Sequence, residues 1–469
     1  MAIKISGSTI IDDSRQLVNV GVSTFSGDIN VTGVGKSIKI GPTNDQLSLE
    51  YDSNGLGLIR QNNNLFLLSP TITVGNLDSS KTSAAFSPAG SVELYHNNSK
   101  KLETTTNGVT VTGSMCATTL YGDGSNLSNV GFGADAQENL YAGTNAGAAS
   151  DSDTCANIAL GCNAGCLLNS GDCNIFLGKS AGNGATSGSY NIGIGCCTNG
   201  GTLTGTHNVS IGAQAGRCLT GGTGNIALGQ GAGMQLTNCI NNVFLGTYSG
   251  RCSDGSYNVF LGTNAGRGSS TVADNTGGHN IAIGEAAGQE LVTGCSNIFL
   301  GFYAGQNTTC CNRNVFIGDC AGRCSDGSCN IFFGFDAGKG SSTVSNNTGY
   351  DNFIAGYRSG AKLTSGNNNV IFGHHAGECI TSASDNVFIG RCSGKGGGSV
   401  TGNQNVALGR CAGASIISAS NSIFIGGYAA SVGASCASSS IFIGYSAGAI
   451  SNSASTNCQN IMIGASAGN

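Results

Sequence analysis

The most regular feature of the chain is a short alternation of apolar and variable residues that is followed each time by glycine. From residue 139 onward one motif recurs: Asn, aliphatic, variable, aliphatic, Gly, two variable residues, Ala or Ser, Gly. Clear copies are NIFLGKSAG at 174–182 and NVFIGDCAG at 314–322. Nineteen copies can be aligned, and Ser422 and Ser440 replace the leading Asn in two of them. Alternation of this length predicts a short β-strand in each copy, closed by turns.

The spacing of the copies predicts how these strands are arranged. Most leading residues are 17 positions apart, which is too short for a helical hairpin and suits one coil of two short strands and two turns. The expected fold is therefore all-β, with a long β-solenoid (β-roll) of about nineteen short coils. At about 4.8 Å per coil these would form a rod of roughly 90 Å. We expect the repeated Asn to form a hydrogen-bonded ladder in a left-handed conformation, and the two glycines to occupy the corners.

A longer period interrupts the regular spacing at two places. Residues 251–284 resemble residues 323–356, which lie 72 positions later, and both contain extra length, at 267–279 and 339–351. Insertions at one phase of a solenoid project from one side, where recognition residues can vary without disturbing the coils. The candidate binding residues in and beside these insertions are Thr271, Asp274, Asn275, His279, Asn346, Asn347 and Asp351.

The middle residue of each strand is apolar more often than a water-facing position should be. If the two flanking aliphatics fill the coil, the middle residues form an outer stripe that must meet a partner chain, because strands apolar on both faces are buried on both faces. The opposite arrangement, with the middle residues inside and the aliphatics facing the partner, stays open. Both arrangements predict an obligate oligomer. The candidate interface residues are Phe176, Phe244, Phe260, Phe299, Phe316, Phe332, Phe388, Phe424 and Phe442.

The first 138 residues lack this motif. Alternating segments at 47–51 (LSLEY), 91–95 (SVELY) and 108–113 (GVTVTG) predict strands separated by polar turns. No segment is long or apolar enough to form a core by itself, so several chains are expected to share one. We divide the chain into an attachment module (1–45), a β-rich shaft (46–138) and the repeat rod (139–469).

Composition and charge narrow the possible partners. With 78 Gly, 39% hydrophobic and 10% charged residues, the chain is neither a set of long amphipathic helices nor a disordered linker. A net charge of −5, without a Lys/Arg run longer than a dipeptide, predicts no nucleic-acid partner. No apolar run is long enough to predict membrane insertion, and the opening MAIKISGSTIIDDSRQ lacks the apolar core of a secretion signal.

The 21 cysteines do not show the paired spacing of zinc sites, so we expect neither a metal nor a cofactor. Small buried residues are the simpler interpretation for most of them. Cys392 and Cys411 occupy the same motif phase in consecutive copies and form a candidate disulfide.

Catalytic residues are sparse. Glu285 and Asp319 share one phase two coils apart, about 10 Å along the rod, which is near the carboxylate spacing of inverting glycosidases. Neither a further acid nor an aromatic platform supports them, and the His374–His375 pair is interpreted as a solvated turn. The chain is not expected to be an enzyme.

Three segments resemble a known family. The opening ISGSTIIDDSRQLVNVGVSTFSG, the segment VELYHNNSKKLETTTNGVTVTG and the segment ATTLYGDGSNLSNV are similar to fibre-type structural proteins of tailed phages that infect marine cyanobacteria and similar hosts. The repeats more loosely resemble the heads of trimeric autotransporter adhesins, although those repeats are shorter and not rich in cysteine.

The resemblance implies a homotrimeric virion fibre that is assembled in the host cytoplasm and works outside the cell. Its N-terminus would bind other virion proteins, and its rod would meet a host-surface glycan or protein. The alternative is an extracellular adhesin or self-stacking filament subunit that is not attached to a virion.

Overall fold

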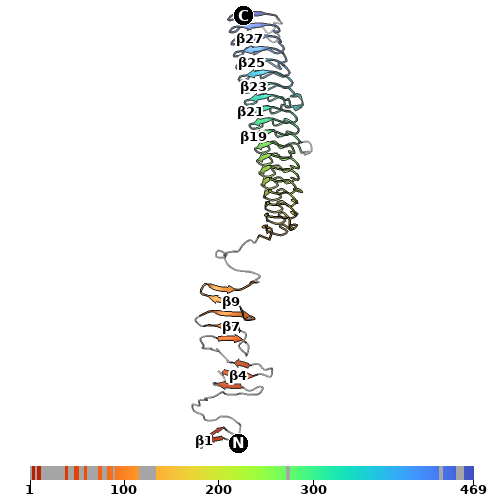
Figure 1. Cartoon of the computed structure of the whole chain (residues 1–469). Coiled ribbons are helices and arrows are strands. Elements are labelled where there is room, and N and C mark those ends of the chain that lie inside the picture. The colour runs from red at the N-terminus through yellow and green to blue at the C-terminus, as the bar shows by residue number, and fades with distance from the viewer. Residues whose placement is uncertain are drawn as a thin grey trace. The chain divides into compact units, whose positions relative to one another are not determined.

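The computed structural model describes residues 3–5, 8–11, 37–40, 47–51, 57–60, 72–75, 82–87, 90–115, 134–270, 275–432, 437–449 and 459–468, with side chains from residue 82 onward. The chain divides into two units, 1–126 and 127–469, and each is described by itself (Figure 1). Nearly all regular structure is β, as expected; the only helix in the described ranges is the 3₁₀ turn η2 (Val344–Asn346). No described helix is long and apolar enough to cross a membrane.

The described residues of the first unit form three antiparallel sheets. Their strand orders are β1-β2, β3-β4-β5 and β10-β9-β8-β7-β6. The segments expected to form strands do so, as β4, β8 and β10. The bounds are β1 (Ile3–Ile5), β2 (Ser8–Ile11), β3 (Ser37–Ile40), β4 (Leu47–Tyr51), β5 (Gly57–Arg60), β6 (Ile72–Gly75), β7 (Thr82–Phe86), β8 (Val92–His96), β9 (Ser99–Thr105) and β10 (Gly108–Val111).

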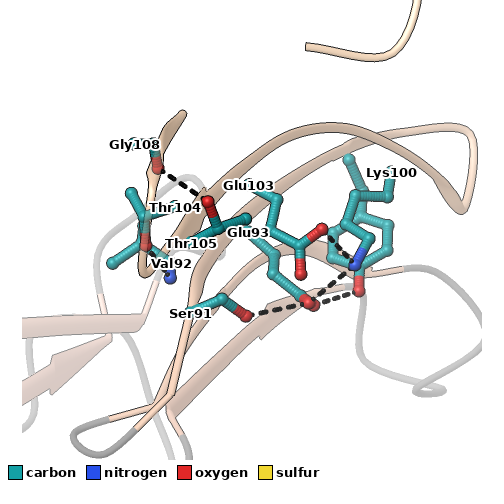
Figure 2. A network of polar contacts seen from close by, with 9 residues as sticks. Ser91, Val92, Glu93, Lys100, Glu103, Thr104, Thr105 and Gly108 are labelled. Atoms are coloured by element: carbon teal, nitrogen blue, oxygen red, sulfur yellow. Dashed lines mark hydrogen bonds and ion pairs between the residues drawn. The ribbon is translucent and has the colours of Figure 1, made fainter. Parts of the chain in front are cut away.

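The β8–β9 hairpin carries a cluster of polar side chains on one face. Figure 2 shows Lys100 between two carboxylates, with its Nζ 3.0 Å from Glu93 Oε1 and 2.9 Å from Glu103 Oε2. Ser91 Oγ also donates to Glu93, at 3.0 Å. Hydrogen bonds from Tyr95, Lys100 and Ser91 lower the pKa of Glu93 from 4.5 to about 2. Contacts with Glu103 and then Glu93 raise the pKa of Lys100 from 10.5 to about 12.

The pKa shifts of Glu93 and Lys100 predict a range of pH in which the β8–β9 hairpin is most stable. The contribution of Glu93 is present above pH 4.5 and is lost as the pH falls toward 2. That of Lys100 is present below pH 10.5 and is lost as the pH rises toward 12. Hydrogen exchange of amides 91–105, corrected for intrinsic rates, should show both losses. The Glu93→Gln variant should lack the acid loss; if it keeps the wild-type profile, the assignment is wrong.

The second unit is a stack of coils around one parallel sheet of nineteen strands, which follow one another in chain order from β11 to β29 (Figure 1). Each strand has three residues and pairs in register with the next, so that residues of one motif phase lie above each other. The register continues across both insertions: Phe260 pairs with Ala282, and Phe332 with Ile354.

The strands of the sheet are β11 (Leu140–Ala142), β12 (Ile158–Leu160), β13 (Ile175–Leu177), β14 (Ile192–Ile194), β15 (Val209–Ile211), β16 (Ile226–Leu228), β17 (Val243–Leu245), β18 (Val259–Leu261), β19 (Ile281–Ile283), β20 (Ile298–Leu300), β21 (Val315–Ile317), β22 (Ile331–Phe333), β23 (Phe353–Ala355), β24 (Val370–Phe372), β25 (Val387–Ile389), β26 (Val406–Leu408), β27 (Ile423–Ile425), β28 (Ile441–Ile443) and β29 (Ile461–Ile463). Each coil thus has one strand rather than the expected two. The opposite wall consists of turns, with isolated bridges at Thr223–Ile240 and Ile380–Val400.

A ladder of buried asparagines runs along the start of the strands, as the repeat predicts. Asn297 shows its geometry: its Nδ2 donates to Asn280 Oδ1 (3.0 Å) and to the Cys311 carbonyl (2.8 Å). Its Oδ1 accepts the backbone N–H (3.0 Å) and Nδ2 (3.2 Å) of Asn314. Each ladder residue therefore joins three coils. A coil is named below by its ladder residue.

The left-handed conformation expected of the ladder Asn belongs instead to the residue before it. Arg313, which precedes Asn314, has φ 56°, and His279, which precedes Asn280, has φ 61°. The two glycines of the motif do occupy positive-φ corners, as expected. Gly301 has φ +135°, and a Cβ there would lie 2.6 Å from the Gly318 carbonyl oxygen in the next coil. Gly305 has φ +57°, and a Cβ there would lie 2.9 Å from the Phe299 ring.

The middle residues of the strands form the core of the stack. Phe299, Phe316 and Phe332 are fully buried, and their rings stack at centroid distances of 5.2 and 4.8 Å. Alanines after the first glycine and leucines from the opposite wall, such as Leu219 and Leu236, complete this core.

The expectation that nine phenylalanines form an oligomer interface is therefore wrong. All nine lie inside the coils of a single chain, at 0–3% exposure, and the flanking aliphatics face outward. The corrected residues are Phe176, Phe244, Phe260, Phe299, Phe316, Phe332, Phe388, Phe424 and Phe442.

The ladder predicts a graded cost of substitution. In Asn297→Ala, the Cys311 carbonyl and the Asn314 amide groups lose buried partners, so we expect local stability to fall by about 3 kcal/mol. Asn297→Ser is the matched control, because at Ser422 and Ser440 a serine hydroxyl continues the hydrogen bonds of the ladder. This variant should lower the local stability by about half as much as Asn297→Ala. Native-state hydrogen exchange near residues 297–315 measures both; equal, small effects would contradict the role of the ladder.

Candidate functional site

The outward face of the nineteen-stranded sheet is apolar along its whole length. The first and third residues of every strand point away from the Phe core, and none of these 38 residues is polar. Among the most exposed are Leu245 at 45%, Phe333 at 50% and Phe372 at 55%. A sheet face in contact with water normally carries polar residues at alternate positions. This face is named the aliphatic face below. Its composition is typical of a buried surface, although no other part of the described chain packs against it.

The two insertions are fastened by buried asparagines. Asn347 Nδ2 donates to the carbonyls of Cys324 (2.7 Å) and Ser341 (2.8 Å), and its Oδ1 accepts the Ser341 N–H. Asn275 makes the equivalent bonds with Ser269 in the first insertion. Both asparagines are only 2% exposed. They hold the loops closed and are not surface recognition residues, which corrects the expectation for these two positions.

The other candidate binding residues fall into three groups. Asn346 is exposed in η2, within the 339–351 insertion. His279 and Asp351 are exposed but directly precede ladder asparagines, so they lie at a corner that every coil has. The ring of His279 stacks on Tyr257 with centroids 4.9 Å apart. Thr271 and Asp274 lie outside the described residues. Host binding by the exposed members stays a prediction.

A column of exposed side chains follows the first glycine of five consecutive coils. Backbone hydrogen bonds of 2.8–2.9 Å link each of these residues to the next coil. The Phe335 ring stacks on Tyr357 at 5.3 Å, and Tyr357 stacks on His374 at 5.0 Å. Two exposed arginines continue the column without a described ion-pair partner. This set, named the edge column below, comprises Phe335, Tyr357, His374, Arg391 and Arg410.

A charged cluster lies beside the edge column and spans three coils. The Glu378 carboxylate is 7% exposed and lies 3.1 Å from Arg358, 2.9 Å from His375 Nδ1 and 3.4 Å from Lys395 Nζ. Burial alone would raise the pKa of Glu378, but His375, Arg358 and Lys395 outweigh it and lower the pKa. The His375 contact is not aligned as a hydrogen bond and acts through charge when the ring is protonated. His374 and His375 both lie in a turn and His374 is exposed, as interpreted, whereas His375 is half-buried against Glu378 rather than solvated.

Glu285 and Asp319 occupy one phase two coils apart, as their spacing predicts, but Phe302 lies in the coil between them. The backbone N–H of Phe302 donates to Asp319 Oδ1 at 3.3 Å, so that carboxylate supports its neighbouring turn. Within the described residues no group of three or more His, Cys, Asp or Glu side chains is placed to hold a metal ion.

Cys392 and Cys411 lie in adjacent coils at the same phase and are free thiols. Burial is the main cause that raises the pKa of Cys411, and the neighbouring Cys392 raises it further. Several other thiols are more enclosed: burial raises the pKa of Cys239 to about 12 and that of Cys311 further still. Only five of the eighteen cysteines in the described part of the chain are buried, so the expectation that most cysteines are small buried residues holds for a minority of them.

Comparison with protein families, with curated protein sequences and with solved structures gave no significant match to this chain. The arguments that follow therefore rest on the residues and their arrangement.

Placement in adjacent coils predicts that Cys392 and Cys411 can be oxidised to a disulfide. The attacking species is the thiolate, so closure should be slow at neutral pH and should accelerate as the pH rises past the ordinary thiol range. Peptide mapping of mildly oxidised, non-reduced protein measures the link, and Cys392→Ser is the control. The buried Cys311 should remain reduced under the same conditions. If Cys392 and Cys411 both stay free at high pH with oxidant present, the pairing is excluded.

Proposed function

We propose that this chain is a structural subunit of a tailed-phage virion fibre, in which three copies assemble through the aliphatic face of the repeat rod. The observation that supports assembly is the complete absence of polar residues at the 38 outward positions of the sheet. The rod holds surface side chains at fixed intervals and serves as a rigid element for adhesion to a host surface. Its function is mechanical and adhesive rather than catalytic.

The size of the aliphatic face is adequate for a stable interface. Nineteen strands at about 4.8 Å make a face roughly 90 Å long, and two columns of side chains make it about 10 Å wide. The resulting area of roughly 900 Å² is comparable to the ~800 Å² that each partner buries in a standard protein interface. It also exceeds the few hundred Å² of contiguous apolar surface that soluble monomers usually expose.

The composition of the two outward columns supports three copies around an axis parallel to the rod. The first column is β-branched at 17 of its 19 positions, whereas the third column holds Leu, Ile, Phe and Ala. Two different columns suit a heterologous contact, in which the first column of one copy meets the third column of the next. Such contacts can close at three, and they keep all N-termini at the same end. The resemblance of three segments within the first 138 residues to phage fibre proteins supports placing that end on the virion.

Sedimentation velocity of the full chain tests the assembly. We expect a species of three times the 46.7 kDa chain mass. Replacing Leu245, Phe333 and Phe372 by Ser removes apolar contacts from the aliphatic face, so it should weaken assembly by at least about tenfold while leaving each coil folded. A soluble, folded wild-type monomer at micromolar concentration would refute the proposed function.

Two control variants separate assembly from folding. Leu167→Ser removes an aliphatic side chain that is 53% exposed but lies off the sheet, and it should leave the assembly unchanged. Phe299→Ser removes a buried ring from the core and should instead unfold its coils, by about 3 kcal/mol or more. If the triple variant behaves like Leu167→Ser, the aliphatic face is not the interface.

A further inference from the structure

Positive charge is concentrated on one edge of the rod, although the chain as a whole is acidic. The full chain has 20 Lys and Arg against 25 Asp and Glu. Between residues 357 and 410 the balance reverses, with five cations against two acids. Of these acids, Asp385 precedes ladder residue Asn386 and so lies at the far end of the strand, whereas Glu378 lies near the edge column. A further acid, Asp336, directly follows Phe335 and is paired with Lys339 at 3.2 Å. This edge therefore carries a local excess of cations, although the net charge of the whole chain is negative.

The geometry of the coils arranges these cations beside aromatic rings. The edge column runs from Phe335 through Tyr357 and His374 to Arg391 and Arg410, with one residue in each coil. It is therefore about 20 Å long, with a step of about 4.8 Å. The Phe335 and Tyr357 rings are 44% and 45% exposed, so part of each ring is open to contact.

The Glu378 cluster holds part of this charge in a fixed position. One buried carboxylate contacts both Arg358 and Lys395, from the coils on either side, and so restrains two cationic side chains while neutralising one charge. Lys362, Arg391 and Arg410 have no described ion-pair partner; Arg410 does lie over the Tyr428 ring at 5.2 Å. Restrained cations lose less conformational freedom on binding, which favours affinity.

We propose that the edge column and the adjoining Arg358, Lys362 and Lys395 form a binding site for an anionic polysaccharide. Guanidinium and ammonium groups pair with sulfate or carboxylate groups, and the exposed aromatic rings pack against the apolar C–H faces of sugar rings. The coil step is similar to the length of one sugar unit, so an extended chain lying along the rod can contact successive coils. This proposal names the ligand class for the adhesive role proposed above and rests on that role.

The pattern favours a polysaccharide over nucleic acid. Strong nucleic-acid binding relies on many phosphate contacts spread over a broad basic surface, whereas this site is a single narrow column in an acidic chain. The column also combines aromatic rings with arginines, and an acidic polysaccharide offers both apolar ring faces and charged groups. Nucleic acid is therefore an outcome to be tested rather than the expected ligand.

Binding of the intact oligomer to defined polymers tests the site. The probes are dextran sulfate, polygalacturonate, uncharged dextran and single-stranded poly-dT, each measured by calorimetry at two salt concentrations. We expect binding to at least one of the two anionic polysaccharides, weakened by salt, and none to uncharged dextran. Comparing sulfate with carboxylate identifies the preferred acidic group.

Matched variants locate the binding. The pair Arg391→Ser and Arg410→Ser should weaken binding by about tenfold or more, equivalent to about 1.4 kcal/mol. The control pair, Lys179→Ser and Arg313→Ser, removes the same charge from exposed positions elsewhere on the rod and should have little effect. Tyr357→Ser should weaken binding by a smaller factor that salt does not change, because it removes a ring contact rather than a charge.

Each contrary result has a defined meaning. Equal loss in both charge pairs, tighter binding of poly-dT, or no binding of either anionic polysaccharide by wild type would overturn the site. Circular dichroism and sedimentation of each variant establish that the coils and the assembly are intact. A wild-type trimer that binds no anionic polysaccharide would reject this inference and leave the assembly proposal standing. A monomer would reject the assembly proposal itself.

Discussion

The buried asparagine ladder imposes the constraint on which the rest of the rod depends. Each ladder residue inside the stack bonds through its side chain or its backbone N–H to the coils on both sides, so a coil cannot slip by one residue without leaving buried polar groups unpaired. In-register stacking then follows for every other position of the motif. Both insertions lie outside the strands, so extra residues are accommodated without a change of register.

In-register stacking converts each motif position into a column with one environment. The middle strand position becomes a stack of rings inside the coil, with Phe316 and Phe332 4.8 Å apart. The outer strand positions become the aliphatic face, and the position after the first glycine becomes the edge column. A residue such as Arg391 therefore acquires neighbours that are far away in sequence. The surfaces that we propose for assembly and for ligand contact both come from the same repeat, at different phases.

The sequence predicted the solenoid, its period and its ladder, because these depend on spacing. It did not determine which face of the strand is inside: Ile175, Phe176 and Leu177 are all apolar, so alternation alone is symmetric. The glycine at 182 was a usable signal, since a Cβ there would collide with the Phe176 ring. The Glu378 cluster was missed because its partners lie about one coil apart in sequence and meet only once the register is known.

The central claim is that each chain encloses its own Phe column and turns its aliphatic face toward other copies. A cryo-electron microscopy map of the full chain, sectioned perpendicular to the rod, tests this claim most directly. The account predicts three closed coils around one axis, with Phe316 inside each coil and Val315 and Ile317 toward the axis. Density in which the Phe column lies between the chains, or in which a single coil stands alone with its aliphatic face toward solvent, would contradict it.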